Sequence, residues 1–321
     1  SFSETVNHAT LSPIELVLHG SPSSGNSYKL TSGTSSVTDG LVFTVTLTLG
    51  DLNALKALRI CINSTSCALE FSSLMAQDMV GLAVVPRSAA DTLPVSSFVV
   101  DTVQPVLSQF DQFDMDAGTI RLSFTESIDM ASVQPNQLYL ARAPSTSALK
   151  YTLTGGSVTS VDGPVIFIEI SHADLNQIKL LQTLCTRDSD CFVRFASSFA
   201  KDVSGNQIAA TTAGVFRSSD FPSNYIDDVT PPQLVSASLN MNTGRVILGF
   251  SEVVPYISFS ALVVRFQESA VSPTETLLLG QTTPGTRVTS TNADTIVYAL
   301  TTADILSLKA FTALAKAQTS T

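Results

Sequence analysis

The strongest constraint on the fold is a repeat of about 125 residues that runs through the chain. A phenylalanine followed two positions later by a glutamate occurs three times, as Phe2 and Glu4, Phe124 and Glu126, and Phe250 and Glu252. Self-similarity at a fixed period indicates one structural unit used several times. We expect a first repeat at 1–100 that lacks its beginning, a complete middle repeat at 101–226, and a third repeat at 227–321 that lacks its end. A repeat that lacks its beginning or its end would expose unpaired strand edges. We therefore also expect the natural chain to continue in both directions.

The pattern inside each repeat predicts β-strands. The segment FDMDAGTIRLSF at 113–124 aligns without gaps with LNMNTGRVILGF at 239–250. In both, a turn rich in Asp, Asn and Gly leads into a run whose alternate residues are apolar, the pattern of a half-buried antiparallel strand. Asp39-Gly40 and Asp162-Gly163 precede the β-branched runs FTVTLTL and VIFIEIS, which is typical of hairpins. We therefore expect an all-β fold of tandem antiparallel β-sandwiches.

One short helix is expected in each repeat. The segments GDLNALKAL at 50–58, ADLNQIKLL at 173–181 and ADILSLKAF at 303–311 have apolar residues at spacings of three and four. Each segment carries an aspartate near its start, where an N-cap belongs. We expect Asp51, Asp174 and Asp304 to be these caps.

Two short loops contain all the cysteines of the chain. The first repeat has CINSTSC at 61–67 and the middle repeat has CTRDSDC at 185–191, whereas the third has AKAQTST at 315–321. Structural zinc sites usually space paired cysteines by two to four residues, and here five residues separate them. The joint loss of both cysteines in the third repeat also favours a local disulfide. We expect Cys61 to pair with Cys67 and Cys185 with Cys191, with free buried thiols as the alternative.

The first cysteine loop also holds an acceptor motif for N-glycosylation, Asn63-Ser64-Thr65. The second loop has Asp188-Ser189-Asp190 at the matching place, so a glycan would not be common to all repeats. Disulfides persist in oxidising compartments. We therefore expect an extracellular or cell-surface protein, with glycosylation of Asn63 if the source is a eukaryotic secretory cell.

The composition argues against several classes of partner. The chain has 17 Lys and Arg against 27 Asp and Glu, a net charge of −10, which does not favour nucleic acid or an anionic membrane. No apolar run approaches the ~18 residues that a membrane helix needs. Charged residues make up only 14 % of the chain, against roughly 25 % in an average domain. A surface with so few charges must be covered by hydroxyls, by glycans or by neighbouring protein such as other repeats or copies.

Catalysis and cofactors are not expected. The three histidines lie at unrelated repeat positions, so the recurring Glu4, Glu126 and Glu252 have no histidine beside them. We interpret these glutamates as structural acids that accept backbone hydrogen bonds near a strand end. Calcium is the alternative considered, because aspartates gather near turns and repeat junctions, but no spacing matches a calcium loop. These aspartates are Asp111, Asp114, Asp116, Asp227 and Asp228.

The junction DDVTPPQLVSASLNMNTGRVILGFSEVV at 227–254 resembles the opening of bacterial-type immunoglobulin-like repeats of S-layer proteins and surface adhesins. In that family an Asp and then Thr-Pro-Pro open the domain, and a strand ending in Phe-Ser-Glu follows. The middle repeat departs from it, with Val-Gln-Pro at 103–105 and Thr125 in place of the serine. KDVSGNQI at 201–208 is similar to a late hairpin of the family.

The resemblance implies tandem immunoglobulin-like β-sandwiches, to which the helix and cysteine loop are additions. The function expected is that of a structural module of a long extracellular filament, for which a flagellar hair, or mastigoneme, is one suitable assembly. Its partners would be other repeats and copies of itself or other fibre proteins. The alternative is an adhesin whose loops bind a glycan or protein; the absence of Trp and the presence of only 6 Tyr weigh against it.

Overall fold

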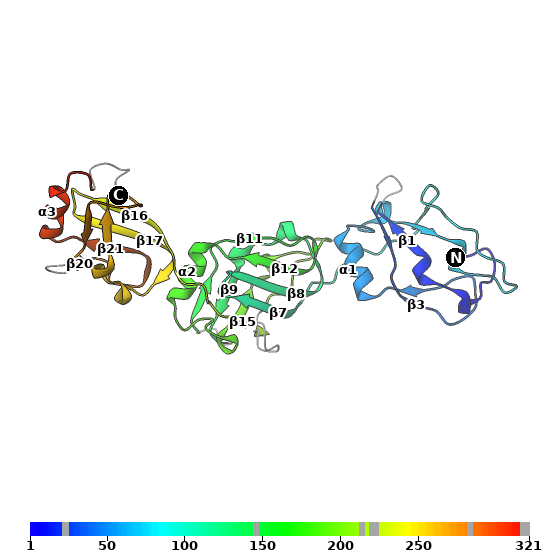
Figure 1. The fold of residues 1–321 in the computed structure, drawn as a ribbon. Helices are drawn as coiled ribbons and strands as arrows, with labels where there is room; N and C mark the ends of the chain where they lie inside the picture. The colour runs from blue at the N-terminus through cyan, green and yellow to red at the C-terminus, as the bar shows by residue number, and fades with distance from the viewer. Residues whose placement is uncertain are drawn as a thin grey trace. The chain divides into compact units, whose positions relative to one another are not determined.

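The computed structural model describes residues 1–20, 26–143, 145, 148–211, 216–217, 225–280 and 285–314. These residues form mostly short β-strands in antiparallel sheets, together with the helices α1 (Leu49–Ala57), α2 (His172–Leu180) and α3 (Thr302–Ala310) (Figure 1). The chain divides into two compact units, Ser1–Asp174 with Thr183–Asp228, and Leu175–Gln182 with Val229–Thr321. The boundary between the units thus falls inside α2.

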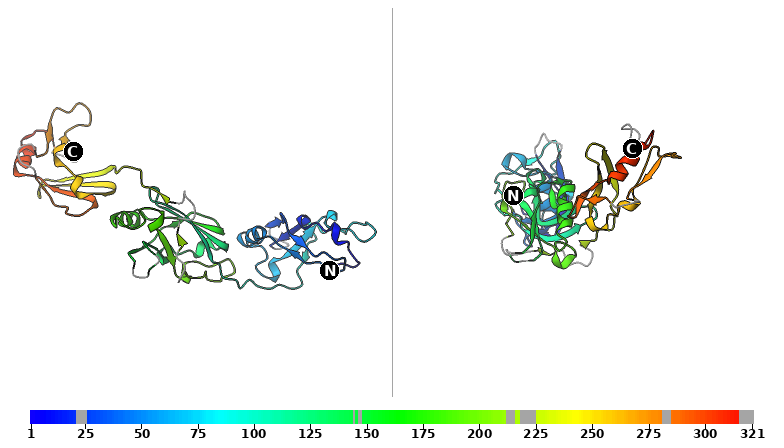
Figure 2. Two further views of the ribbon diagram at one scale, coloured as in Figure 1. Left: turned by 90° about the horizontal axis from the view of Figure 1, so that it is seen from below. Right: turned by 90° about the vertical axis from the view of Figure 1, so that its left-hand side faces the viewer.

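The middle repeat contains two sheets (Figures 1 and 2). The larger has the order β11-β12-β8-β7-β15, and only β15 pairs in parallel. The smaller has the order β10-β9-β13-β14. The strands are β7 (Leu107–Asp114), β8 (Thr119–Ile128), β9 (Leu138–Ala141), β10 (Lys150–Thr152), β11 (Ser157–Val158), β12 (Gly163–Glu169), β13 (Phe192–Phe195), β14 (Phe216–Arg217) and β15 (Tyr225–Ile226).

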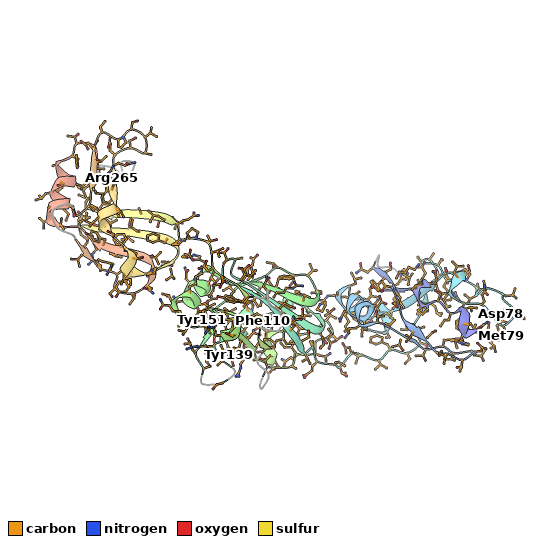
Figure 3. All side chains as sticks on the ribbon, turned by 60° about the horizontal axis from the view of Figure 1, so that its bottom comes forward. Asp78, Met79, Phe110, Tyr139, Tyr151 and Arg265 are labelled. Atoms are coloured by element: carbon orange, nitrogen blue, oxygen red, sulfur yellow. A yellow bond between two sulfur atoms is a disulfide. The ribbon has the colours of Figure 1, made fainter. Side chains whose placement is uncertain are left out.

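The core of the middle repeat follows the predicted alternation. Ile120, Leu122 and Phe124 of β8 are buried, and each alternates with a more exposed residue. Phe110 of β7, labelled in Figure 3, is fully buried in the same core. Burying one large apolar side chain contributes about 1.5–3 kcal/mol to the free energy of folding. The buried side chains on the inward face therefore stabilise this sheet.

The first repeat has a sheet of order β2-β1-β5-β6 and a separate pair, β3 with β4. The strands are β1 (Leu16–His19), β2 (Ser27–Lys29), β3 (Thr34–Ser35), β4 (Val45–Thr46), β5 (Ala68–Phe71) and β6 (Leu93–Pro94). The long strand expected for FTVTLTL at 43–49 is wrong in extent, because only Val45 and Thr46 pair as a strand. The helix α1 already begins at Leu49, so local helix formation ends this run.

The third repeat has a sheet of order β16-β17-β21-β20 and the pair β18 with β19. The strands are β16 (Leu234–Asn240), β17 (Arg245–Val254), β18 (Arg265–Gln267), β19 (Thr276–Leu278), β20 (Thr286–Arg287) and β21 (Ala293–Ala299). The hairpin β16–β17 corresponds to β7–β8 in sequence and pairs in the same antiparallel way. The segment AKAQTST at 315–321 lies outside the described residues.

Single 3-10 turns connect many of the strands. They lie at His8–Thr10, Pro13–Glu15, Ser64–Ser66, Ser73–Met75, Met130–Ser132, Pro135–Gln137, Asp188–Asp190, Ser197–Phe199, Tyr256–Ser258 and Ala261–Val263.

The expectation that Asp51 and Asp304 are N-caps is wrong. The caps are Thr48 and Thr301, whose hydroxyls accept the backbone N–H of Asp51 at 3.1 Å and of Asp304 at 3.0 Å. The aspartates are therefore the third residue of each helix, the place of the acid in a capping box. Ser171 does the same for Asp174, at 3.1 Å.

These aspartates are buried because they bind the neighbouring strand as well as the helix end. The Tyr151 hydroxyl (Figure 3) donates to Asp174 at 2.7 Å, and that of Tyr28 donates to Asp51 at 2.8 Å. The backbone N–H of Thr31 also donates to Asp51, at 3.1 Å. Burial acts to raise the pKa of Asp51, but hydrogen bonds from Thr31 and Tyr28 outweigh it and lower that pKa to about 2.

Candidate functional site

The helix of the first repeat binds the middle repeat through a nearly buried ion pair. Helix α1 lies against β8 and β12 (Figure 1). The Lys56 Nζ donates to Oε2 of Glu126 and lies 2.7 Å from Oδ2 of Asp101. Only 13 % of the Lys56 side chain and 6 % of the Glu126 side chain are exposed. A pair so well removed from solvent depends strongly on both partners being present.

An asparagine on the same helix fixes the position of the strand. The backbone N–H of Ser127 donates to Oδ1 of Asn53 at 3.1 Å, and the Ser127 hydroxyl donates to the Asn53 carbonyl at 2.7 Å. Both bonds are buried. Buried hydrogen bonds are directional and costly to leave unmade, so they set the register between helix and strand. We call Asn53, Lys56, Glu126 and Ser127 the first joint.

A more exposed ion pair borders the first joint. The Arg59 guanidinium lies 2.9 Å from Oδ1 of Asp129 and 2.9 Å from Oδ2 of Asp162. The Arg59 side chain is 46 % exposed, so water screens these pairs and their contribution is modest.

The same arrangement occurs a second time, within the second compact unit. The Lys179 Nζ donates to Oε2 of Glu252 at 2.5 Å, and the Val253 backbone N–H donates to Oδ1 of Asn176 at 3.2 Å. The Lys179 and Glu252 side chains are 13 % and 12 % exposed. We call Asn176, Lys179, Glu252 and Val253 the second joint. Two sites with matched residues at matched places show that the joint is a property of the repeat.

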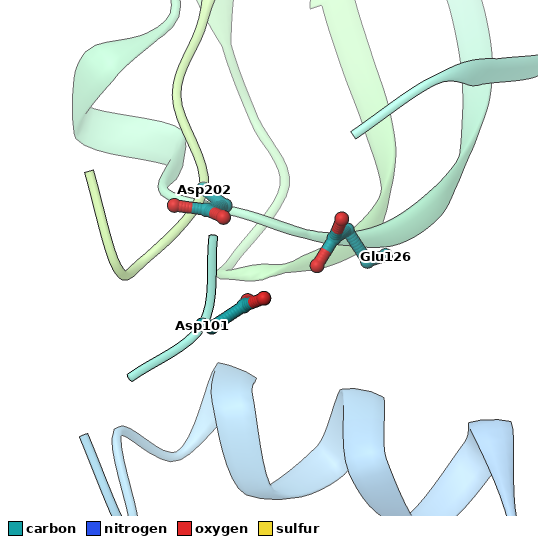
Figure 4. A group of neighbouring side chains, drawn as sticks. All are labelled: Asp101, Glu126 and Asp202. Carbon is teal, nitrogen blue, oxygen red and sulfur yellow. The ribbon is translucent and has the colours of Figure 1, made fainter. Parts of the chain in front are cut away.

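Two further acids, Asp101 and Asp202, lie beside Glu126 of the first joint. Asp101, Glu126 and Asp202 have ligand-type oxygens within 4.8 Å of one another (Figure 4). Asp202 is held by its own turn, because its Oδ1 accepts the backbone N–H of Ser204 at 2.9 Å and of Asn206 at 2.8 Å. This leaves Asp101 and Glu126 to share the ammonium of Lys56.

Burial and the ion pairs act on the pKa values in opposite directions. Burial lowers the pKa of Lys56, but bonds to Asp101 and Glu126 outweigh it, so the net shift is upward. Burial, together with the charges of Asp101 and Asp202, outweighs the Lys56 ammonium at Glu126, so the pKa of Glu126 is raised. At Asp101 the Lys56 ammonium outweighs burial, so the pKa of Asp101 is lowered. The lysine therefore stays charged at neutral pH and holds Asp101 ionised.

Two of the aspartates considered for calcium, Asp111 and Asp114, accept hydrogen bonds from neighbouring protein groups. Asp111 Oδ2 accepts the Ser123 hydroxyl at 2.7 Å, and Asp114 Oδ1 accepts the backbone N–H of Asp116 and Ala117 at 2.9 and 2.8 Å. The second pattern is an ordinary Asx turn. The acids that the structure brings together at the first joint already surround the ammonium of Lys56.

The cysteine loops are closed by disulfides between Cys61 and Cys67 and between Cys185 and Cys191. Both loops begin with a cysteine in the left-handed region, at φ 58° and 51°. Within the first loop, Asn63 is exposed, and its Oδ1 accepts the N–H of Thr65 at 3.0 Å and of Ser66 at 2.9 Å. The loops lie directly after the helices that form the joints.

The interpretation of the recurring glutamates as acceptors of backbone hydrogen bonds is wrong for Glu126 and Glu252, which accept a lysine ammonium. No role was predicted from the sequence for Lys56, Lys179, Asn53 or Asn176. The signal was present, because each lysine lies five residues after the helix aspartate and each asparagine two residues after it. Phe2 and Glu4 lie at the matching place of the first repeat, but residues 1–5 form no strand there. Val6 makes only isolated bridges, to Gly40 and Asp78, and Glu4 is exposed.

In the part of the chain that the structure describes, no helix has the length and apolar character to span a membrane. The sequence matches no protein-family model and no curated protein.

Two solved structures of bacterial S-layer proteins are weakly similar to this chain. One is the crystal structure of the S-layer protein rSbsC(31-844), at 11 % identity and a TM-score of 0.25, covering 62 % of this chain and 26 % of that one. The other is the N-terminal part of the bacterial S-layer protein SbsC, at 12 % identity and a TM-score of 0.25, covering 62 % of this chain and 44 % of that one. This chain thus spans less than half of either structure, and at these TM-scores neither likeness carries an argument about fold or function.

Proposed function

We propose that this chain is a structural module of a long extracellular filament, built from tandem immunoglobulin-like β-sandwiches and without catalytic activity. The observation that supports this proposal is the repeated joint, in which a helix of one repeat binds the strand end of the next through Lys56 and Glu126, and again through Lys179 and Glu252. The joint is a mechanical device rather than a reactive one. A flagellar hair is one assembly that such a module would serve.

The energetics of the joint fit a structural module whose repeats must keep one fixed arrangement. Two charges removed from water contribute little net stability, but removing either partner leaves a buried charge and costs about 3–5 kcal/mol. The asparagine bonds add direction to the contact. Between the first and middle repeats, such a joint favours one angle over many loosely packed ones, which is what a filament requires.

The disulfides of the cysteine loops support an extracellular location. Disulfides persist in oxidising compartments, and both loops are closed in this way. The exposed Asn63 is accessible for glycosylation beside the first disulfide. The partners of the module would be neighbouring repeats and further copies, since the net charge of −10 does not favour nucleic acid.

Two measurements on the native material test this proposal. Non-reducing peptide mapping by mass spectrometry should recover the Cys61–Cys67 and Cys185–Cys191 peptides, with added mass on the Asn63 peptide in a eukaryotic source. Antibodies against the chain should label an extracellular filament at regular intervals in electron micrographs. Free thiols together with an intracellular label would contradict it.

A further inference from the structure

Three acids from separate segments of the chain meet beside the first joint. Asp101 lies between β6 and β7, Glu126 lies near the end of β8, and Asp202 begins a tight turn late in the middle repeat (Figure 4). Their ligand-type oxygens lie within 4.8 Å of one another. We call these three residues the acidic cluster. Because its members are up to about a hundred positions apart, the fold and not a local motif brings them together.

The acidic cluster has more negative charge than its basic neighbour balances. The Lys56 ammonium contacts Asp101 and Glu126, so three ionised carboxylates against one ammonium leave two negative charges in excess. Glu126 is 5 % exposed and Asp202 is 1 % exposed, so water solvates this excess poorly. Burial and the charges of Asp101 and Asp202 raise the pKa of Glu126 for the same reason. Buried charge is costly unless an opposite charge compensates it.

One oxygen of the acidic cluster is buried and has no partner. Lys56 donates to Oε2 of Glu126, whereas Oε1 accepts no hydrogen bond from the residues that the structure describes. Figure 4 shows the carboxylate of Glu126 turned toward Asp101 and Asp202. A buried polar atom without a partner needs an explanation, and a bound ion is one that satisfies it. This atom therefore points to a ligand independently of the gathering of the acids.

Neighbouring groups hold the other two acids in place. Oδ1 of Asp202 accepts the backbone N–H of Ser204 and of Asn206, and the Asn206 amide donates to Oδ2 at 2.8 Å. The same amide donates to the backbone carbonyl of Asp101 at 3.1 Å. Asn206 thus joins the segment of Asp101 to the turn of Asp202 and keeps two acids of like charge close together.

We propose that Asp101, Glu126 and Asp202 bind one calcium ion beside the first joint. Oε1 of Glu126 would be a direct ligand together with an oxygen of each aspartate, and water would complete the coordination. The two charges of the ion balance the excess of the acidic cluster. Lys56 remains on Oε2 of Glu126, so the ion and the ammonium use different oxygens.

The spacing of the acidic cluster favours calcium over magnesium. Calcium binds oxygen ligands at about 2.3–2.6 Å in flexible geometry, so opposite ligands can lie up to about 5 Å apart. The 4.8 Å limit of the acidic cluster falls within that span. Magnesium binds at about 2.0–2.1 Å in a strict octahedron, which requires a tighter set of ligands. A calcium ion here would link the Asp101 segment, the end of β8 and the late turn at the place where α1 docks.

Calcium titration of the metal-free full chain tests the site. Isothermal titration calorimetry should show one ion bound per chain, with a dissociation constant of about 10⁻⁴–10⁻³ M, the range of extracellular modules. Glu126→Gln and Asp202→Asn should each weaken binding at least about tenfold, because the number of ligand charges sets the affinity. Magnesium should bind at least about tenfold more weakly than calcium.

Manganese locates the ion in the wild-type chain. Mn²⁺ takes the same kinds of oxygen ligand as Ca²⁺, and its unpaired electrons broaden the NMR signals of nearby amides. The amide signals of Ser204 and Asn206 should broaden first, and calcium should restore them. This readout holds even if one of the variants fails to fold, which circular dichroism of each variant checks.

Asp78→Asn is the matched control. Asp78 accepts the backbone N–H of Val80 at 2.9 Å and of Leu82 at 2.8 Å, so it holds a turn of the first repeat as Asp202 holds its own. Asp78 lies outside the acidic cluster, and the substitution should leave calcium binding unchanged.

The proposal is overturned if no binding appears up to about 10 mM calcium, ten times the weakest expected constant. It is also overturned if folded Glu126→Gln and Asp202→Asn bind like the wild type, if magnesium binds as tightly, or if manganese broadens amides away from the turn. These measurements read ion binding alone, so such a failure would leave the proposed structural function standing.

Discussion

At the scale of single residues, Lys56 holds two carboxylates in a nearly buried place. Replacing Lys56 by alanine should lower the free energy of unfolding by about 3–5 kcal/mol, because Glu126 and Asp101 would lose their ammonium partner. Urea denaturation of the full chain, followed by circular dichroism, measures this loss. Lys29→Ala is the matched control, since the Lys29 side chain is 58 % exposed and lies 3.7 Å from Glu15. It should cost no more than about 1 kcal/mol, and equal losses for the two variants would contradict the joint.

A second prediction at this scale concerns Asp51, whose pKa is lowered to about 2 in the folded chain. The ordinary value of an unfolded aspartate is about 3.9, so its stabilising effect is complete above that pH and is lost as the pH falls through about 2. The difference in melting temperature between the wild type and Asp51→Asn should therefore shrink from about pH 4 towards pH 2. Thermal unfolding followed by circular dichroism across this range provides the test. Asp91→Asn, at an exposed position, is the control, and a difference that does not change with pH would show that the carboxylate charge is not involved.

At the scale of elements, the cysteine loop closes the segment that leaves each helix. Replacing Cys61 and Cys67 together by serine should lower stability by about 2 kcal/mol, the chain-entropy estimate for so short a loop. Replacing Cys185 and Cys191 should have a similar effect on the middle repeat. Differential scanning calorimetry with and without a reductant measures both. If the reductant leaves the melting temperature of the wild-type chain unchanged, the disulfides are not a source of stability.

The elements also show what can be predicted from sequence and what cannot. Period-two alternation predicted the buried face of β8, with Ile120 and Leu122 inward, because strand burial is a local pattern. The three helices were predicted from spacings of three and four. The caps of α1 and α3 were misplaced by about one turn, because the capping residue in each is a threonine three residues before the aspartate.

The joint was not predicted because its partners are far apart in the chain. Lys56 and Glu126 are separated by 70 residues, and neither periodicity nor turn chemistry indicates which distant charges meet. The recurring glutamates stand out in the sequence as a repeat feature, whereas no role was predicted for the recurring helix lysines. Matching recurrent charges of opposite sign between consecutive repeats would have suggested the pair.

At the scale of the whole molecule, we propose that the first joint holds the first and middle repeats in one arrangement. The most direct measurement is the distance distribution between spin labels on Ser27→Cys in β2 and Ser108→Cys in β7, two exposed strand positions on either side of the first joint. We predict a single narrow distribution, which broadens when Asn53→Ala and Lys56→Ala are added. A distribution that is already broad, or that the two joint substitutions leave unchanged, would contradict the account.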